Sequence, residues 1–278
     1  MSLPISIVMI AKNESRQMAE ALNTAKGWAD EIVVVDDEST DNTREIAGQF
    51  TDKIFTRKMD LEGPQRNFAA SKAKNDWVMI LDCDERITDE LKVEIEGILK
   101  NWDQKTVAYW VPQISYLGHY HLKHGGWANP HVRLYNRKHF RFKEIPQDLV
   151  HPGLETDEGF TGAVCKGHLI HYNFASVEDY IRKINRQTTL EALKWHISKK
   201  KMGTGRAIWR MVDRFFRRFI GKGGWKDGYY GFVAAVCSGF YEFAAYSKLR
   251  EIRDRGAYIK EYGVEDLVKE SELAESPC

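Results

Sequence analysis

The stretch WVMILDCDER, residues 77–86, begins as an apolar run and ends in acidic side chains. Asp82, Asp84 and Glu85 follow a segment that we expect to be a buried strand, where close carboxylates repel one another and lose hydration. Carboxylate oxygens are the ligands that Mg²⁺ and Mn²⁺ prefer, and Mg²⁺ combines one or two of them with phosphate oxygens. The pattern therefore favours a divalent cation bridging a diphosphate. The alternative, equally open for an isolated short motif, is that Asp82 caps the next segment while Asp84 and Glu85 are solvated.

Strand and helix patterns alternate around this stretch in the first hundred residues. A continuous apolar run, typical of a strand covered on both faces, lies at residues 5–11, and further strands are predicted at residues 31–37, 53–57 and 77–81. Helical spacing separates them, which predicts a parallel sheet with helices on both faces. Ligands of such sheets bind beyond the carboxyl ends of the strands. We therefore expect three groups to face one crevice: Asn13 with Glu14, Asp36 with Asp37, and Asp82 with Asp84.

Two of the polar groups near these strands have open interpretations. Asp36 and Asp37 suit a bond to a base or a ribose, as an acidic residue makes in dinucleotide folds. They also suit the start of the DESTDNT turn, and a phosphoacceptor aspartate is a third alternative. Arg66 lies near the start of a predicted helix, where a diphosphate contact is favourable; alone, it reads equally as a surface charge.

From about residue 105 the pattern changes. Residues 106–118, 131–142 and 164–174 read as strands of a mixed, smaller sheet. Ser176, with Asp179 three residues later, is a capping-type start for a helix that reaches about Lys200. Two further helices are predicted over roughly 204–220 and 227–252.

The composition is that of a soluble globular protein: 278 residues, 43% hydrophobic and 29% charged, with a formal net charge of +1. This charge gives no indication of a nucleic-acid partner, and we predict none. The four cysteines form no Cys-x-x-Cys pair, so a reducing cytoplasm fits better than a disulfide framework. The N-terminal residues lack the pattern of a signal peptide, and no apolar run reaches the roughly 18 residues of a spanning helix. We predict a cytoplasmic location.

Eight motifs together carry a family resemblance. In this order and spacing, ISIVMIAKNE, EIVVVDDESTDNT, PQRNFA and WVMILDCDER resemble family 2 glycosyltransferases of the GT-A fold. HGGW, HVRLY, HLIHYNFASVEDYIRKINRQTTLEA and WKDGYYGFVAAVCSGFYEFAAYSKL resemble a bacterial branch that includes β-1,4-glucosyltransferases of the lipopolysaccharide core. The resemblance extends to about residue 250.

The resemblance implies an α/β fold of GT-A type, with a Rossmann-like, mostly parallel central sheet, flanking helices and a C-terminal helical region. It implies three parts: a nucleotide-sugar-binding half at 1–104, an acceptor-binding half of the same domain at 105–174, and the helical region at 175–278. The activity implied is an inverting, metal-dependent transfer of a hexose. The donor would be a nucleotide sugar such as UDP-glucose, and the acceptor a bacterial surface glycan or glycolipid such as lipopolysaccharide core.

The donor site implied by the resemblance has seven members: Lys12, Asn13, Glu14, Asp36, Arg66, Asp82 and Asp84. Glu14 would lie toward the ribose, Asp36 would take the uracil edge, and Arg66 would contact the diphosphate. Asp84, with Asp82, would bind Mg²⁺ or Mn²⁺. In such enzymes a carboxylate base deprotonates the acceptor while the metal stabilises the departing diphosphate.

The expected base is the point at which this sequence departs from the branch. A Val-His-Glu-like stretch is expected after the RLY strand, but Pro152 stands where the Glu would be. Asp148 is our first candidate for the base, with Glu144 and His151 behind it; alternatively, Asp148 is only a turn residue. The departure at Pro152 also supports an alternative function, a catalytically degenerate family member that acts as a nucleotide- or partner-binding scaffold. A nucleotidyltransferase would need a Gly-rich loop, which AKNESRQM lacks.

The histidines are dense, but their spacing lacks the clean pairs of a zinc site. We expect His124, in HGGW, to shape a sugar pocket in which Trp127 stacks on a pyranose. His171 either completes the metal's ligands or is a satisfied core histidine.

A basic amphipathic helix is predicted in the C-terminal region. Its apolar stripe comprises Ile208, Met211, Val212, Phe215, Phe216 and Phe219, and the remaining surface carries Arg210, Arg214, Arg217 and Arg218. Such a helix predicts an anchor on an anionic leaflet, or packing on the catalytic domain or on a partner subunit. A lipid-linked acceptor favours peripheral contact with the inner face of the cytoplasmic membrane. A homo-oligomer is left open.

Overall fold

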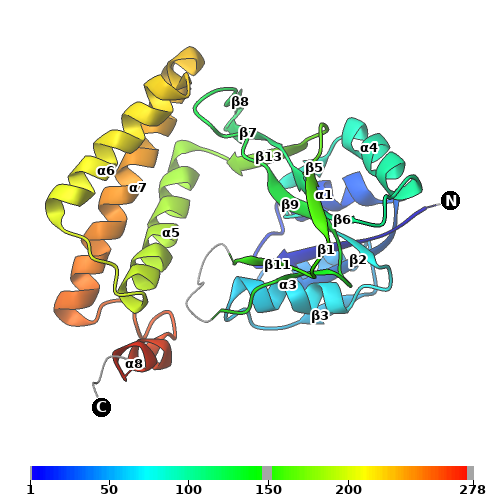
Figure 1. The fold of residues 1–278 in the computed structure, drawn as a ribbon, viewed down its shortest axis with the longest axis horizontal. Helices are drawn as coiled ribbons and strands as arrows, with labels where there is room; N and C mark the ends of the chain where they lie inside the picture. Colours follow the sequence, from blue (N-terminus) through cyan, green and yellow to red (C-terminus); the bar gives the residue numbers. More distant parts are fainter. Residues whose placement is uncertain (1, 146–151, 274–278) are drawn as a thin grey trace. The chain divides into compact units, whose positions relative to one another are not determined.

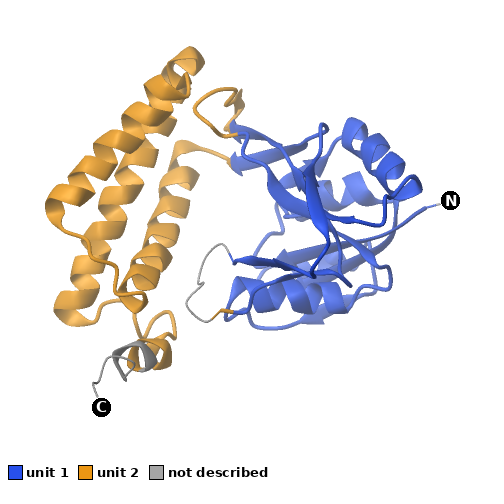
Figure 2. Ribbon diagram, in the orientation of Figure 1, with its two compact units in different colours: residues 1–116, 128–144, 152–173 blue, residues 117–127, 145–151, 174–278 orange. Residues whose placement is uncertain are grey.

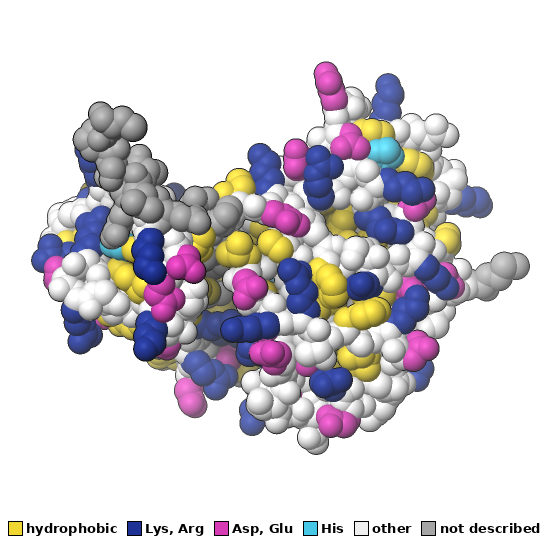
Figure 3. All heavy atoms as spheres, turned by 90° about the horizontal axis from the view of Figure 1, so that it is seen from below, with side chains coloured by type: hydrophobic (Ala, Val, Ile, Leu, Met, Phe, Trp, Pro, Cys, Tyr) yellow, Lys and Arg dark blue, Asp and Glu magenta, His cyan; other side chains and the backbone are white. Residues whose placement is uncertain are grey.

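The computed structural model describes residues 2–145 and 152–273. The chain divides into two compact units, shown in different colours in Figure 2. The first comprises residues 1–116, 128–144 and 152–173, and the second comprises residues 117–127, 145–151 and 174–278. On the face shown in Figure 3, basic and acidic side chains are interspersed, in keeping with the small net charge.

A seven-stranded sheet forms the centre of the first unit (Figure 1). Its strands, in spatial order, are β12 (Thr161–Val164), β6 (Thr106–Val111), β9 (His131–Asn136), β4 (Trp77–Ile80), β1 (Leu3–Ala11), β2 (Ala29–Asp36) and β3 (Ile54–Thr56). All neighbouring strands pair in parallel except β9, which is antiparallel to both β4 and β6. The prediction of a mostly parallel central sheet is therefore confirmed.

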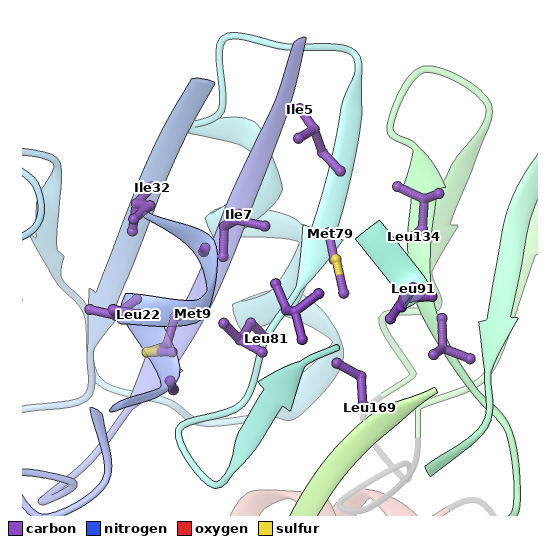
Figure 4. Packing of buried hydrophobic residues seen from close by; sticks show 14 of the residues in the cluster. Ile5, Ile7, Met9, Leu22, Ile32, Met79, Leu81, Leu91, Leu134 and Leu169 are labelled. Carbon is purple, nitrogen blue, oxygen red and sulfur yellow. The ribbon is translucent and has the colours of Figure 1, made fainter. Parts of the chain in front are cut away.

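Helices cover both faces of this sheet, as the alternating pattern predicts. They are α1 (Met18–Ala25), α2 (Thr43–Ala47), α3 (Glu62–Ser71) and α4 (Asp89–Lys100). Because successive strand residues point to opposite faces, Ile7 and Met9 of β1 join one core cluster, with α1 and α4, while Val8 joins the other, with α3. Figure 4 shows Ile7 and Met9 packed near Leu22 of α1. Burial of both faces explains the continuous apolar runs of these strands.

The strands after residue 105 do not all form a separate smaller sheet, contrary to expectation. β6, β9 and β12 complete the central sheet, whereas β7 (Gln113–Leu117) and β13 (Leu169–Phe174) join β5 (Glu85–Ile87) in a smaller one. The burial patterns explain the division: β9 is buried from Val132 to Asn136, as expected of a strand covered on both faces, while residues of β7 alternate between buried and half-buried. Three shorter strands complete this part of the chain: β8 (Tyr120–His121), β10 (Phe140–Phe142) and β11 (Leu154–Thr156).

The second unit is built largely from helices. They are α5 (Val177–Ile197), α6 (Thr204–Phe216), α7 (Gly228–Arg255) and α8 (Glu265–Leu273), with a π-helical turn at Arg217–Gly221 and a 3-10 turn at Gly224–Asp227 between α6 and α7. The Ser176 hydroxyl accepts a hydrogen bond from the backbone N–H of Asp179 at 3.1 Å, which confirms the predicted start of α5. Among the described residues, no helix is both long and apolar enough to cross a membrane.

Candidate active site

The predicted polar groups meet at one edge of the central sheet. Because β1 lies between β4 and β2, the segments that follow these three strands are neighbours. Backbone hydrogen bonds continue the ladders past the strand ends: the Leu81 N–H donates to the Val8 carbonyl at 3.1 Å, and the Asp37 N–H donates to the Ala11 carbonyl at 2.8 Å. The carboxyl ends of the strands thus bring Lys12 to Glu14, Asp36 and Asp37, and Asp82 to Asp84 to the same edge, as the sheet rule predicts.

The loop after β1 is tied to the loop after β2 by hydrogen bonds. The Asn13 N–H donates to the Ser39 hydroxyl at 2.9 Å, and the Thr40 N–H donates to the Asn13 side-chain oxygen at 2.8 Å. The Glu14 N–H donates to the Thr43 hydroxyl at 2.8 Å. Asn13 has a left-handed backbone with φ 55°, a conformation that asparagine tolerates better than most residues. The Asn13 side chain therefore shapes the loop that presents Glu14.

The two aspartates at the end of β2 have different surroundings. Asp37 is buried, and its carboxylate accepts hydrogen bonds from Lys12 Nζ at 3.1 Å and from the Met59 N–H at 2.9 Å. Asp36 is also buried, and its Oδ2 accepts from the Ser39 N–H at 3.2 Å. Asp36 Oδ1 has no hydrogen-bond partner among residues 2–145 and 152–273. A buried carboxylate oxygen without a partner is costly, so this atom is suited to accept an N–H from a ligand.

Two guanidinium groups hold the Asp82 carboxylate. Arg133 Nη2 lies 2.8 Å from Asp82 Oδ2, and Arg66 Nη2 lies 3.7 Å from Asp82 Oδ1. Burial raises the pKa of Asp82, but Arg133 and Arg66 outweigh it and hold the pKa below its ordinary value. Arg66 is further paired with Glu62, one turn earlier in α3. Within the described residues, the positive charge that balances Asp82 therefore comes from arginines of β9 and α3.

Glu85 is fully buried and joins Asp82, Arg66, Arg133 and Gln113 in what we call the charge cluster. Its Oε1 accepts hydrogen bonds from Arg133 Nη2 at 2.6 Å and from Gln113 Nε2 at 2.5 Å, and its Oε2 accepts from the Asp82 N–H at 3.1 Å. Burial raises the pKa of Glu85, and Arg133 only partly opposes this effect. The alternative in which Glu85 is merely solvated is therefore wrong. Glu85 positions Arg133 and the backbone of Asp82.

Asp84 faces a histidine rather than an arginine. His171 Nε2 lies 3.3 Å from Asp84 Oδ1, and His171 Nδ1 lies 3.0 Å from Gln113 Oε1. Because the Gln113 amide nitrogen donates to Glu85, its oxygen faces the ring, so His171 Nδ1 carries the hydrogen and Nε2 points at Asp84. Burial lowers the pKa of His171, but Asp84 and Glu85 outweigh it and raise the pKa above its ordinary value.

The Asp84–His171 pair fits a divalent cation. An imidazole whose second nitrogen is fixed by a hydrogen-bond acceptor is typical of metal sites. Among the described residues there is no group of three or more His, Cys, Asp or Glu side chains that could hold a metal ion. Mg²⁺, however, commonly takes only one or two carboxylates together with substrate phosphates. A cation in this position would therefore depend on a phosphate ligand.

His124 and Trp127 belong to the second unit, where their surroundings are well defined. His124 Nδ1 lies 2.9 Å from Oδ1 of the buried Asp227, whose Oδ2 accepts from the His124 N–H at 2.8 Å. The Arg218 guanidinium lies 4.3 Å from the centre of the Trp127 ring and donates to the Gly125 carbonyl at 2.9 Å. One face of Trp127 is thus covered by an arginine, and its stacking on a sugar stays a prediction.

The candidates for the general base are placed only in part. Asp148 and His151 lie outside the described residues. The Glu144 carboxylate accepts a hydrogen bond from the Asn67 side chain at 2.9 Å, and the same amide group donates to the Phe142 carbonyl at 2.8 Å. Glu144 is therefore attached to α3 in the first unit.

Sequence reasoning missed two members of the charge cluster, Arg133 and Gln113. Arg133 had a signal, since a single arginine interrupts the apolar strand HVRLY, and a buried arginine requires carboxylate partners. Gln113 had none, because its role depends on the lateral placement of β7, β13 and β5.

Comparison with known proteins gives the class to which this fold and site belong. The protein is a glycosyltransferase: residues 6–153 match the sequence model of Glycosyl transferase family 2, and the chain belongs to that family. The predicted family is therefore confirmed, as is the predicted α/β fold with a mostly parallel central sheet, flanking helices and a C-terminal helical region.

Relatives match along most of the chain. The uncharacterized glycosyltransferase RP128 of Rickettsia prowazekii is 32% identical over 254 residues, which cover 89% of this chain and 87% of that protein. The lipopolysaccharide core biosynthesis glycosyltransferase LpsC of Rhizobium meliloti is 27% identical over 253 residues, covering 89% and 92%. Among solved structures, residues 1–349 of S. aureus TarS align with a TM-score of 0.42 at 14% identity, covering 93% of each chain.

Proposed function

We propose that this glycosyltransferase is an inverting, metal-dependent enzyme that moves a hexose from a nucleotide sugar, UDP-glucose or a similar donor, to a bacterial surface glycan such as lipopolysaccharide core. The observation that carries the proposal is the paired arrangement after β4. Asp82 is held by two arginines, and Asp84 faces a histidine. The same edge therefore offers cationic groups for a diphosphate and a carboxylate–imidazole pair for a metal.

The arginines supply the binding groups for the diphosphate. Arg66 Nη2 is 3.7 Å from Asp82, longer than a hydrogen bond, so this contact can give way to a phosphate oxygen. Guanidinium groups bind phosphates through paired, charge-assisted hydrogen bonds. Arg133 is more firmly held, because it bonds both Asp82 and Glu85. Arg66 is thus the arginine that turns to the donor, and Arg133 keeps Asp82 in place.

The end of β2 supplies a group for the base of the donor. Asp36 Oδ1 is a buried acceptor with no partner in the described part of the chain. Uracil presents one N–H on its pairing edge, and a hydrogen bond from that group would satisfy the carboxylate oxygen. Glu14, presented by the neighbouring loop, is the predicted contact of the ribose. A uridine donor is therefore the best match to this edge.

Asp84 and His171 are the residues that would hold Mg²⁺ or Mn²⁺, with Asp82 as the second predicted carboxylate. When bound, the ion supplies charge stabilisation for the departing diphosphate. Gln113 fixes the His171 ring through Nδ1 and so keeps Nε2 directed at the Asp84 carboxylate.

Inversion requires a base that removes the acceptor proton during a single displacement. Asp148 remains the proposed base, and His124 and Trp127 the proposed acceptor-pocket residues. The similarity to LpsC, named for lipopolysaccharide core biosynthesis, supports a surface glycan as acceptor. A lipid-linked acceptor would place the enzyme at the inner face of the cytoplasmic membrane.

The donor is tested by thermal stabilisation with a panel of nucleotide sugars, with and without Mn²⁺. A ligand that binds only the folded state adds about 2.7 kcal/mol of stability at a hundred times its Kd. We expect one UDP-sugar to raise the melting temperature when Mn²⁺ is present. Asp84→Ala should lose the effect, whereas Asp52→Ala should keep it, because Asp52 is exposed and precedes β3 at the opposite edge of the sheet.

Three results would each contradict a part of the proposal. The donor assignment fails if no nucleotide sugar stabilises the wild type. Stabilisation without any donor hydrolysis or sugar transfer would instead support a nucleotide-binding scaffold. If Asp148→Asn transfers sugar at the wild-type rate, Asp148 is not the base.

A further inference from the structure

Exposed apolar side chains gather on α6, the π-helical turn and α7. Nine of them, each between 42 and 72% exposed, make up a surface that we call the aromatic face: Ile208, Trp209, Val212, Phe216, Ile220, Tyr229, Phe232, Val236 and Phe240. On each helix they recur at spacings of three or four residues, so they form a stripe along one side. Large exposed apolar patches on soluble proteins mark sites of interaction.

The two stripes are one continuous surface. Phe232 of α7 contacts Phe215 and Phe219, with ring centres 6.0 and 5.7 Å apart. Phe215 in turn contacts Phe216, whose ring centre lies 5.2 Å away. The helices approach closely at Gly239, where an added Cβ would lie 2.8 Å from the Met211 carbonyl oxygen. The aromatic face is thus a feature of the packed helix pair, which the sequence of α6 alone does not reveal.

The arginines of α6 are not arranged as the amphipathic pattern predicts. Arg210 and Arg214 both pair with the buried Glu242 of α7, at 2.6 and 2.7 Å. Arg218 lies over Trp127. Of the four arginines predicted on the polar face, Arg217 is the one that is exposed, and it is paired with Asp213. The arginines mainly stabilise the unit, because a buried carboxylate in α7 and an aromatic ring engage them.

Basic residues nevertheless lie beside the aromatic face, in the turns between α6 and α7. Lys222 and Lys226 are exposed, and Trp225 between them is 55% exposed. Tyr229, the first stripe residue of α7, is 72% exposed. Tryptophan and tyrosine have an apolar body and a polar edge, and they favour the boundary between hydrocarbon and water. Lysines at the same level attract anionic headgroups.

We propose that the aromatic face binds the surface of an anionic lipid bilayer, with Lys222 and Lys226 at the headgroups. The exposed side chains would enter the boundary of the acyl chains, as in interfacial helices. A second copy of the chain is the alternative occupant of this face, and the experiment below distinguishes it from a bilayer. Membrane binding is proposed independently of the proposed function. Only its purpose, which is access to a lipid-linked acceptor, rests on that function.

Vesicle binding by the full chain tests the proposal without any glycosyl transfer. The probes are vesicles of phosphatidylcholine alone and of phosphatidylcholine mixed with phosphatidylglycerol, and binding is measured by co-sedimentation. The variant is Phe216→Ser with Phe240→Ser. Its matched control is Val93→Ser, because Val93 in α4 of the first unit is 69% exposed and lies outside the aromatic face.

We expect the wild type and Val93→Ser to bind the anionic vesicles. The double phenylalanine variant should bind at least about tenfold more weakly, which corresponds to about 1.4 kcal/mol. Lys222→Gln with Lys226→Gln should weaken binding to anionic vesicles by roughly fivefold for each lysine, with no effect on phosphatidylcholine vesicles. Circular dichroism and donor-dependent thermal stabilisation of the same samples establish that each variant is folded.

Three results would overturn the proposal. The first is that the wild type fails to bind anionic vesicles. The second is that the phenylalanine variant binds them as tightly as the wild type does. In the third, light scattering shows a dimer of the wild type that the phenylalanine variant abolishes, so that a second copy covers the face. Donor stabilisation is read separately, so a failure of lipid binding is distinguishable from a failure of the proposed function.

Discussion

Replacement of Arg133 by methionine removes the central charge of the cluster while keeping the length of the side-chain stem. Arg133 is buried and lies 2.8 Å from Asp82 and 2.6 Å from the fully buried Glu85. Removing one partner of a buried ion pair leaves the other charge uncompensated and costs about 3–5 kcal/mol. Against a typical unfolding free energy of about 5–15 kcal/mol, this is a large fraction of the total.

Urea denaturation followed by circular dichroism measures the effect as a shift of the midpoint at constant slope. The matched control is Arg141→Met: Arg141 pairs with Glu155 and Asp157, but its side chain is 52% exposed, and surface pairs contribute only about 0–1 kcal/mol. Adding Glu85→Gln to Arg133→Met should restore part of the loss, because the buried charge is then removed. An Arg133→Met protein within about 0.5 kcal/mol of the wild type would refute this account of the cluster.

Three further predictions concern other parts of the chain. Gly239→Ala should destabilise the protein by about 1–3 kcal/mol in thermal unfolding, because the new Cβ would lie 2.8 Å from a backbone oxygen of α6. Gly205→Ala is the control and should not destabilise the protein, because a Cβ added there would have no heavy atom within 4 Å. Equal effects of the two substitutions would contradict the packing argument. Gln113→Met should weaken the Mn²⁺ dependence of donor stabilisation by roughly 10–100-fold, because it frees the His171 ring; an unchanged Mn²⁺ titration would show that the ring needs no such support. For Asp41, burial raises the pKa, but hydrogen bonds from neighbouring serine and threonine groups outweigh it and lower the pKa from its model-peptide value of 3.8 to about 2. The stabilisation that the Asp41 carboxylate gives the folded state is therefore present above about pH 4 and lost as the pH falls toward 2. The melting temperatures of the wild type and Asp41→Asn should converge over that range. A constant difference between them would exclude this linkage.

The central sheet could be predicted because its strands carry their own signal. Residues 5–11 and 32–35 are apolar runs, and both faces of these strands are covered by helices. The position of the polar groups followed from the same pattern, because the residue after a parallel strand necessarily lies at the sheet edge. Asp36 and Asp82 were therefore found from local sequence alone.

What could not be predicted depends on contacts between distant segments. β9 lies in the central sheet between β4 and β6, and nothing in the sequence of β9 indicates which strands it pairs with. Arg210 and Arg214 read as surface charges of α6 because their partner, Glu242, lies about thirty residues further along the chain. Gln113 joins Glu85 to His171 through hydrogen bonds that span 28 and 58 residues.

The arginine contacts of Asp82 would couple the binding of the proposed nucleotide donor to the binding of the proposed metal ion. A phosphate that drew Arg66 away would leave the charge of the Asp82 carboxylate less compensated, which would increase its attraction for a cation. A cation that engages Asp82 in turn releases Arg66 toward a phosphate. Because such a coupling free energy is reciprocal, the nucleotide and the metal should raise each other's affinity by the same factor. The stretch WVMILDCDER would then hold either ligand firmly only when both are present.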